Sequence, residues 1–184
     1  MISSRTDIYA GGRWVAANSR EKVSLTNPAT EETVGTAPDG DHTDVDHVVA
    51  AARTAFRDSG WAQLSPRERG EFLEPFASHL VNRADEIGSL ITSENGTPAT
   101  LSSPVNVFGG AAMLRYYQVL SKDLDLEDDR GSTIVTREPR GVAALVVPWN
   151  GPLILALQKL GPALVAGCSV VIKPSPETSL DSQF

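Results

Sequence analysis

The chain has 184 residues, of which 41% are hydrophobic and 21% charged, a length and balance typical of one soluble globular domain. Its formal net charge of −7 argues against a nucleic-acid or anionic-membrane partner, because phosphate groups repel such a surface. Cys168 is the only cysteine and the first residues contain no apolar signal core, so no internal disulfide can form and we expect a cytoplasmic protein.

The first forty residues predict short antiparallel strands. Gly11 and Gly12 provide a turn between aromatic and β-branched residues. Asn27 and Pro28 then precede another extended run. Such turn signals between extended segments are typical of β-hairpins.

A helix is expected next, with Thr43 and Asp46 resembling a capping box and Gly60 ending it. Its apolar residues recur at helical spacing: Val45, Val48, Val49, Ala52 and Phe56. The acidic and histidine residues of segment 39–47 also admit a metal site. They lack the spacing of a calcium loop, and acidic residues favour a helix N-terminus in any case, so we expect capping and no metal.

Three further helices are predicted between residues 65 and 120. The first begins with Ser65 as N-cap, Pro66 in the first turn and Glu68 completing a capping box. The second covers residues 84–94 and ends at Asn95-Gly96. The expected apolar side of the first comprises Leu73, Phe76, His79 and Leu80, with His79 a packed or surface residue rather than a catalyst.

The last of these helices runs from about Pro104 to Leu120, and its expected buried side comprises Phe108, Met113, Leu114, Tyr117 and Leu120. After it, residues 121–140 alternate charges with apolar residues around a turn at Asp128–Gly131. This pattern predicts a two-stranded ribbon with one polar face. Because an isolated hairpin is barely stable in water, we expect it to lean on another domain or subunit.

The C-terminal segment predicts a strand–helix–strand unit: a strand at 141–147, a helix at 152–167 and a strand at 169–174. The strands should be parallel. Ligands bind beyond the carboxyl ends of such strands, where Asn150 and Lys173 lie. The residues alone leave open whether Asn150 faces a ligand or caps the helix. A membrane span across 141–172 is the weaker alternative, because prolines and glycines interrupt it.

Several stretches, in order along the whole chain, resemble the aldehyde dehydrogenase superfamily: TNPATEETVG, ENGTP, LRYYQVL, REPRGVAALVVPWNGPL, LGPALVAGCSVVIKPS and ETSL. The resemblance implies an α/β fold, the N-terminal part of an aldehyde dehydrogenase-like structure. Short strands and helices would be followed by the start of a Rossmann-like parallel sheet. It places the N-terminal part of the cofactor-binding domain at 1–120, an oligomerisation ribbon at 121–140 and the first unit of the dinucleotide-binding sheet at 141–184.

The family oxidises aldehydes to acids with NAD or NADP through a cysteine thiolate and a water-activating glutamate. By resemblance, Asn150 would donate a hydrogen bond to the oxyanion that forms. The implied cofactor-binding residues are Val146, Val147, Pro148, Trp149, Lys173 and Ser175. A glutamate common three residues after the lysine is replaced by Pro176, with Glu177 one place later. A carboxylate there favours NAD, so the resemblance leaves the choice between NAD and NADP open.

Cys168 is not expected to be the nucleophile, because it lies at a chain turn with no neighbouring base, and the family's catalytic cysteine comes much later. Family members are more than twice as long as this chain. We therefore expect the nucleophile and catalytic domain to be absent, and the isolated chain to oxidise no aldehyde. A complete enzyme would act on a small-molecule aldehyde and pair with copies of itself or a complementary chain. The alternatives are a non-catalytic partner module and a degenerate remnant.

Overall fold

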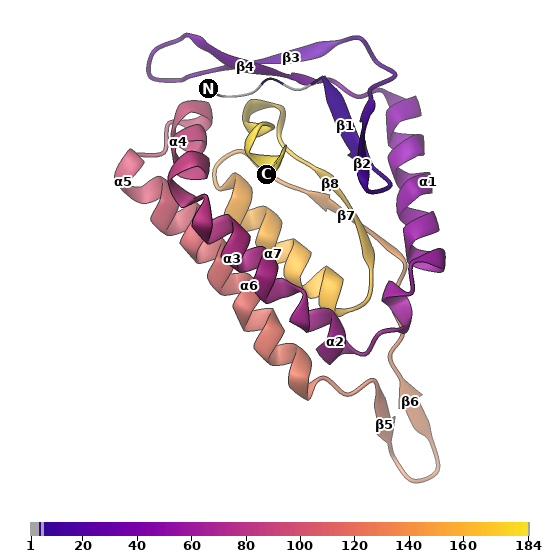
Figure 1. Ribbon diagram of the computed structural model, residues 1–184. Helices are drawn as coiled ribbons and strands as arrows, with labels where there is room; N and C mark the ends of the chain where they lie inside the picture. The colour runs from indigo at the N-terminus through magenta and orange to yellow at the C-terminus, as the bar shows by residue number, and fades with distance from the viewer. Residues whose placement is uncertain (1–3, 5, 184) are drawn as a thin grey trace.

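A computed structural model describes residue 4 and residues 6–183. Helices α3, α6 and α7 lie side by side, and the strand pair β7–β8 lies over α7 (Figure 1). Helix α1 flanks the strand pair, and the ribbon β3–β4 crosses one end of the molecule. Within the described residues the strands form four two-stranded sheets.

The N-terminal hairpins are confirmed. Strand β1 (Asp7–Ala10) pairs antiparallel with β2 (Arg13–Ala16). Gly11 and Gly12 between them have φ values of 59° and 80°, which glycine adopts at little steric cost. Strand β3 (Lys22–Thr26) pairs antiparallel with β4 (Thr33–Pro38).

Helix α1 (His42–Asp58) begins earlier than the sequence pattern indicated, so the capping box expected at Thr43 and Asp46 is wrong. Asp41 is the N-cap, and its carboxylate accepts the N–H groups of Thr43 and Asp44 at 2.8 and 3.0 Å. Asp44 accepts the Asp41 N–H in return, at 3.2 Å. Within the described residues no group of His, Cys, Asp or Glu is arranged to hold a metal ion.

The Ser65–Glu68 capping box is confirmed at α2 (Pro66–Glu71), which follows the short helix η1 (Trp61–Gln63). Helix α3 (Leu73–Asn82) exposes His79 to solvent. Helix α4 (Ala84–Asn95) ends as predicted, with Gly96 at a φ of 75°.

The helix expected from Pro104 starts earlier and is irregular. Helix α5 (Ala99–Leu101) leads into a π-helical segment, η2 (Ser102–Phe108), and then α6 (Gly109–Leu120). The expected buried side is wrong at Phe108 and Leu120, which are 47% and 45% exposed. A π-helical turn contains more residues than an α-helical turn, so the buried face shifts to Val107, Ala111 and Leu114.

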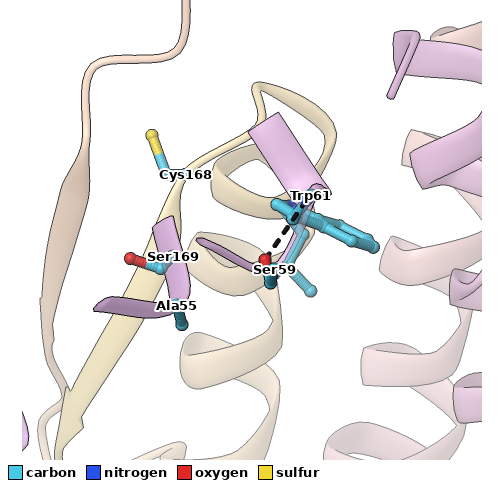
Figure 2. Close-up of a pocket in the computed structure, with 6 residues that line it drawn as sticks. Ala55, Ser59, Trp61, Cys168 and Ser169 are labelled. Carbon is cyan, nitrogen blue, oxygen red and sulfur yellow. Dashed lines mark hydrogen bonds between the residues drawn. The ribbon is translucent and has the colours of Figure 1, made fainter. Parts of the chain in front are cut away.

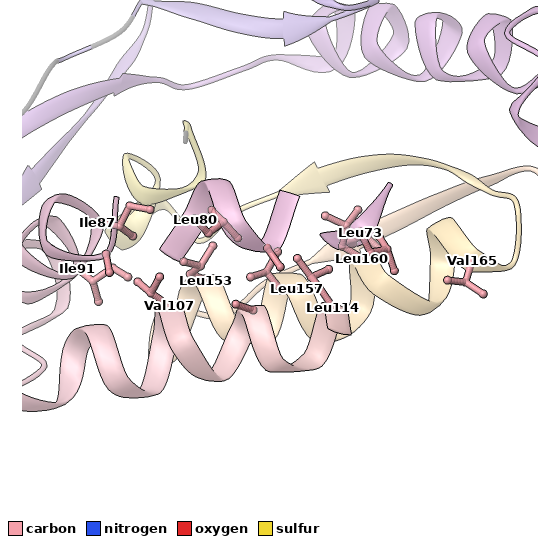
Figure 3. Packing of buried hydrophobic residues seen from close by; sticks show 14 residues of the cluster. Leu73, Leu80, Ile87, Ile91, Val107, Leu114, Leu153, Leu157, Leu160 and Val165 are labelled. Atoms are coloured by element: carbon pink, nitrogen blue, oxygen red, sulfur yellow. The ribbon is translucent and has the colours of Figure 1, made fainter. Parts of the chain in front are cut away.

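The main core lies where α3, α4, α6 and α7 meet (Figure 3). Its fully buried members are Leu73, Ala77, Leu80, Ile87, Ile91, Val107, Ala111, Leu114 and Leu157. Gly110 allows α6 and α7 to approach closely, because a Cβ there would lie 2.5 Å from Leu157 Cδ1.

The predicted ribbon is confirmed as β5 (Glu127–Asp129) paired antiparallel with β6 (Ile134–Thr136), after the short helix η3 (Ser121–Asp123). It projects from the body of the molecule (Figure 1). Ile134 is 61% exposed, so the ribbon presents an apolar side chain to solvent.

The strand–helix–strand unit is confirmed. Strand β7 (Val142–Val146) pairs in parallel with β8 (Ser169–Lys173), and α7 (Pro152–Val165) connects them. Two short helices follow, η4 (Pro176–Thr178) and η5 (Asp181–Gln183). In the part of the chain that the structure describes, no helix is both long and apolar enough to cross a membrane.

Candidate functional site

The two parallel strands end at one edge of their sheet. Val146 is paired in register with Lys173, and the Val147 N–H donates to the Lys173 carbonyl at 3.1 Å. This edge is where ligands bind in parallel α/β sheets. The structure therefore places the ends of β7 and β8 side by side, with residues 148–150 following one strand and residues 174–175 following the other.

Asn150 lies in the turn between β7 and α7 and is exposed to solvent. The N-cap residue of α7 is Gly151, with Pro152 in the first turn, and no side chain caps the helix. The alternative that Asn150 serves as a helix cap is therefore wrong. Its amide is available for another partner at the carboxyl edge of the sheet.

The backbone around Asn150 is held by other elements. The Lys159 ammonium, from α7, donates to the Val146 carbonyl. The Asn95 side-chain amide, from the end of α4, donates to the Trp149 carbonyl at 3.1 Å. On the far side, the Leu155 N–H donates to the Gly151 carbonyl at 3.0 Å. The turn is thus tied to two helices.

The expected cofactor-lining residues differ in what they present. Val146 and Trp149 are 61% and 54% exposed, and Pro148 is also exposed. Val147 is only 5% exposed and belongs to the interior. Its backbone N–H already donates to the Lys173 carbonyl.

Lys173 and Ser175 stand at the end of β8 beside an acidic group. The Lys173 ammonium donates to the Pro174 carbonyl at 3.0 Å, and the Ser175 hydroxyl donates to the Glu177 carboxylate. The hydrogen bond from Ser175 lowers the pKa of Glu177, and the nearby Lys173 charge lowers it further. A negative charge therefore stands next to Ser175 at neutral pH, although position 176 is a proline and the glutamate is at position 177.

Cys168 lies at the opposite end of β8, before its first residue Ser169. It borders a pocket of about 220 Å³ lined by Ala55, Ser59, Trp61, Leu164, Cys168 and Ser169. The side chain is 7% exposed, and Figure 2 shows its sulfur pointing away from Ser59 and Trp61. A buried thiol at the far end of the strand from Asn150 supports the expectation that Cys168 is not the nucleophile.

A buried pair of carboxyl groups was missed by the sequence reasoning. Glu94, 3% exposed, accepts the N–H groups of Leu180 and Asp181 at 2.7 and 3.1 Å. Burial raises the pKa of Glu94 to about 7. Burial and the charge of Glu94 raise the pKa of Asp181 well above its ordinary value. The residues are 87 positions apart in the sequence, and no local pattern connects them.

Comparison with known proteins identifies a family for this architecture. The model of the aldehyde dehydrogenase family matches residues 14–184. Geranial dehydrogenase of Castellaniella defragrans is 38% identical over 99% of this chain and 39% of its own length. A 3-succinoylsemialdehyde-pyridine dehydrogenase from a Pseudomonas species is 39% identical over 92% of the chain and 35% of its own length.

Solved structures agree. An aldehyde dehydrogenase of Mycobacterium tuberculosis in complex with NAD+ matches 100% of this chain and 39% of its own, with 33% identity and a TM-score of 0.94. A variant of aldehyde dehydrogenase C of Pseudomonas syringae, complexed with NAD+ and octanal, matches the same shares with 34% identity and a TM-score of 0.92. The chain thus spans about two fifths of the length of the relatives it matches.

Proposed function

Because this chain belongs to the aldehyde dehydrogenase family, we propose that it contributes to the NAD(P)-dependent oxidation of an aldehyde to a carboxylic acid. The observation that carries this proposal is the carboxyl edge of β7–β8. Asn150, which is exposed and does not cap α7, follows β7 at this edge, and Lys173 and Ser175 lie at the end of β8.

Asn150 is the proposed oxyanion donor. A carboxamide donates a hydrogen bond without changing charge, so it can stabilise the alkoxide that forms when a thiolate attacks an aldehyde. Pro148 and Pro152 restrict the backbone on both sides of the turn, and hydrogen bonds to Trp149 and Gly151 fix it further. Little reorganisation is then needed as the negative charge develops.

The groups at the end of β8 suit the ribose part of a nicotinamide dinucleotide. Lys173 supplies an ammonium donor, Ser175 a hydroxyl and Glu177 a carboxylate acceptor, which is a donor and acceptor set that can hydrogen-bond ribose hydroxyls. The exposed Val146, Pro148 and Trp149 would line the dinucleotide along the end of β7. When bound, the cofactor accepts the hydride that the aldehyde loses.

Glu177 supports NAD rather than NADP as the preferred cofactor. Its carboxylate accepts from Ser175 and its pKa is lowered, so it is ionised at neutral pH. The extra phosphate of NADP would meet this negative charge, whereas a ribose hydroxyl can donate to it.

The described parts of the chain supply no accessible thiolate nucleophile, since Cys168 is buried away from the edge. We expect residues 1–184 alone to oxidise no aldehyde. The projecting ribbon β5–β6, with Ile134 exposed, supports self-association or pairing with a complementary chain.

The experiment compares purified residues 1–184 with the protein expressed from the complete gene. The assay measures aldehyde-dependent formation of NADH and NADPH, with size-exclusion chromatography for assembly. We expect activity only in the second preparation, if its gene encodes further sequence. Activity of the isolated chain would contradict the proposed division of labour, and no activity in either preparation would contradict the proposed function.

A further inference from the structure

The peptide bond that carries Asn150 is restrained by a residue from a distant part of the chain. The Trp149 carbonyl oxygen belongs to the same peptide plane as the Asn150 nitrogen. That oxygen accepts a hydrogen bond from Asn95 Nδ2 at 3.1 Å, across 54 positions of sequence. The orientation of this plane sets the direction in which the Asn150 side chain leaves the backbone.

The amide of Asn95 can face only one way. Its Oδ1 accepts the Thr97 N–H at 2.9 Å, while its Nδ2 donates to Trp149. A flipped amide would place its nitrogen against the Thr97 N–H and its oxygen against the Trp149 carbonyl. Both hydrogen bonds therefore hold the donor in place, on a side chain that is itself half-buried.

The end of α4 gives Asn95 a rigid base. The preceding residue, Glu94, is 3% exposed and binds the backbone N–H groups of Leu180 and Asp181. The following residue, Gly96, has a φ of 75° and packs against Pro28. Neighbouring residues at one helix end thus contact the segment after β7 and the segment after β8.

We propose that Asn95 is a positioning residue for Asn150. It fixes the Trp149–Asn150 peptide from one side, while the start of α7 fixes Gly151 from the other. Asn95 then acts through the oxyanion donor, because a preorganised donor stabilises developing charge without moving. The inference rests on the proposed function, since it assigns Asn150 to the oxyanion.

Two substitutions of Asn95 test this. Asn95→Asp and Asn95→Ser each keep an oxygen that can accept the Thr97 N–H. The aspartate presents an acceptor to the Trp149 carbonyl, and the serine is too short to reach it. Asn82→Asp is the matched control, because Asn82 is an exposed asparagine at the end of another helix, α3.

In the protein from the complete gene, we expect both Asn95 variants to lower kcat roughly 3- to 10-fold and to leave the KM for the cofactor unchanged. The control variant should keep the kcat of the unsubstituted enzyme. In an Asn150→Ala background, Asn95→Asp should lower kcat no further, because its effect passes through the missing amide. An unchanged kcat in both variants, or an equal loss in that background, would overturn the proposal.

Backbone ¹⁵N relaxation of residues 1–184 provides a readout that needs no activity. Order at the amides of Asn150 and Gly151 should fall in both variants and stay constant in the control; unchanged order overturns the restraint. If the unsubstituted enzyme oxidises no aldehyde, the proposed function has failed, and this measurement still decides the restraint by itself.

Discussion

Gly167 is the position where a single methyl group should be most disruptive. It links α7 to β8 with a φ of 82°, and an added Cβ would lie 1.8 Å from Arg69 Nη1 and 2.6 Å from Pro139 Cγ. The left-handed conformation alone costs a non-glycine residue about 1–2 kcal/mol. Arg69 is 0% exposed and Pro139 is a rigid ring, so overpacking adds about 1–3 kcal/mol. Gly167→Ala should therefore lower the free energy of unfolding by about 2–5 kcal/mol.

The assay is urea denaturation of residues 1–184, followed by circular dichroism. Gly60→Ala is the control, because Gly60 has a φ of 80° and its added Cβ would contact nothing within 4 Å. It should lose only the conformational part, about 1–2 kcal/mol. Equal losses of unfolding free energy in the two variants would show that Arg69 and Pro139 move aside without energetic cost, which would refute the packing argument.

Two further predictions concern charge. The pKa values of Glu94 and Asp181 are raised from 4.5 and 3.8, so their stabilisation is complete at low pH and is lost as pH rises, through about 7 for Glu94. The free energy of unfolding should fall as pH rises from about 4.5 to about 7, by about 3 kcal/mol from Glu94. Asp181→Asn should reduce this slope, and an equally steep slope in that variant would argue against the pair. Glu177→Gln should lower the ratio of kcat/KM for NAD+ to that for NADP+ about tenfold, a charge effect of about 1.4 kcal/mol. An unchanged ratio would remove Glu177 from cofactor selection.

The sequence predicted the elements whose stabilising contacts lie between residues close together in the chain. The Ser65–Glu68 capping box and the stop at Gly96 are examples, and the parallel pairing of β7 with β8 followed from an apolar strand–helix–strand pattern. The resemblance to aldehyde dehydrogenases is confirmed by the family model and by solved structures.

Features that depend on distant contacts could not be predicted. The buried face of η2 and α6 shifted because a π-helical turn changes the spacing, leaving Phe108 exposed. The hydrogen bonds from Asn95 to Trp149 and from Leu180 to Glu94 join segments that only the fold brings together. The local pattern of a single sequence does not indicate which distant residues form such pairs.

The role of Asn150 is the central claim, and its most direct test is the rate of aldehyde oxidation by Asn150→Ala in the protein from the complete gene. Loss of one oxyanion donor should lower kcat roughly 10²- to 10³-fold, with the affinity for NAD+ measured by calorimetry unchanged. A kcat within about twofold of the unsubstituted enzyme would contradict the assignment, because a difference below about 0.4 kcal/mol is too small for such a donor.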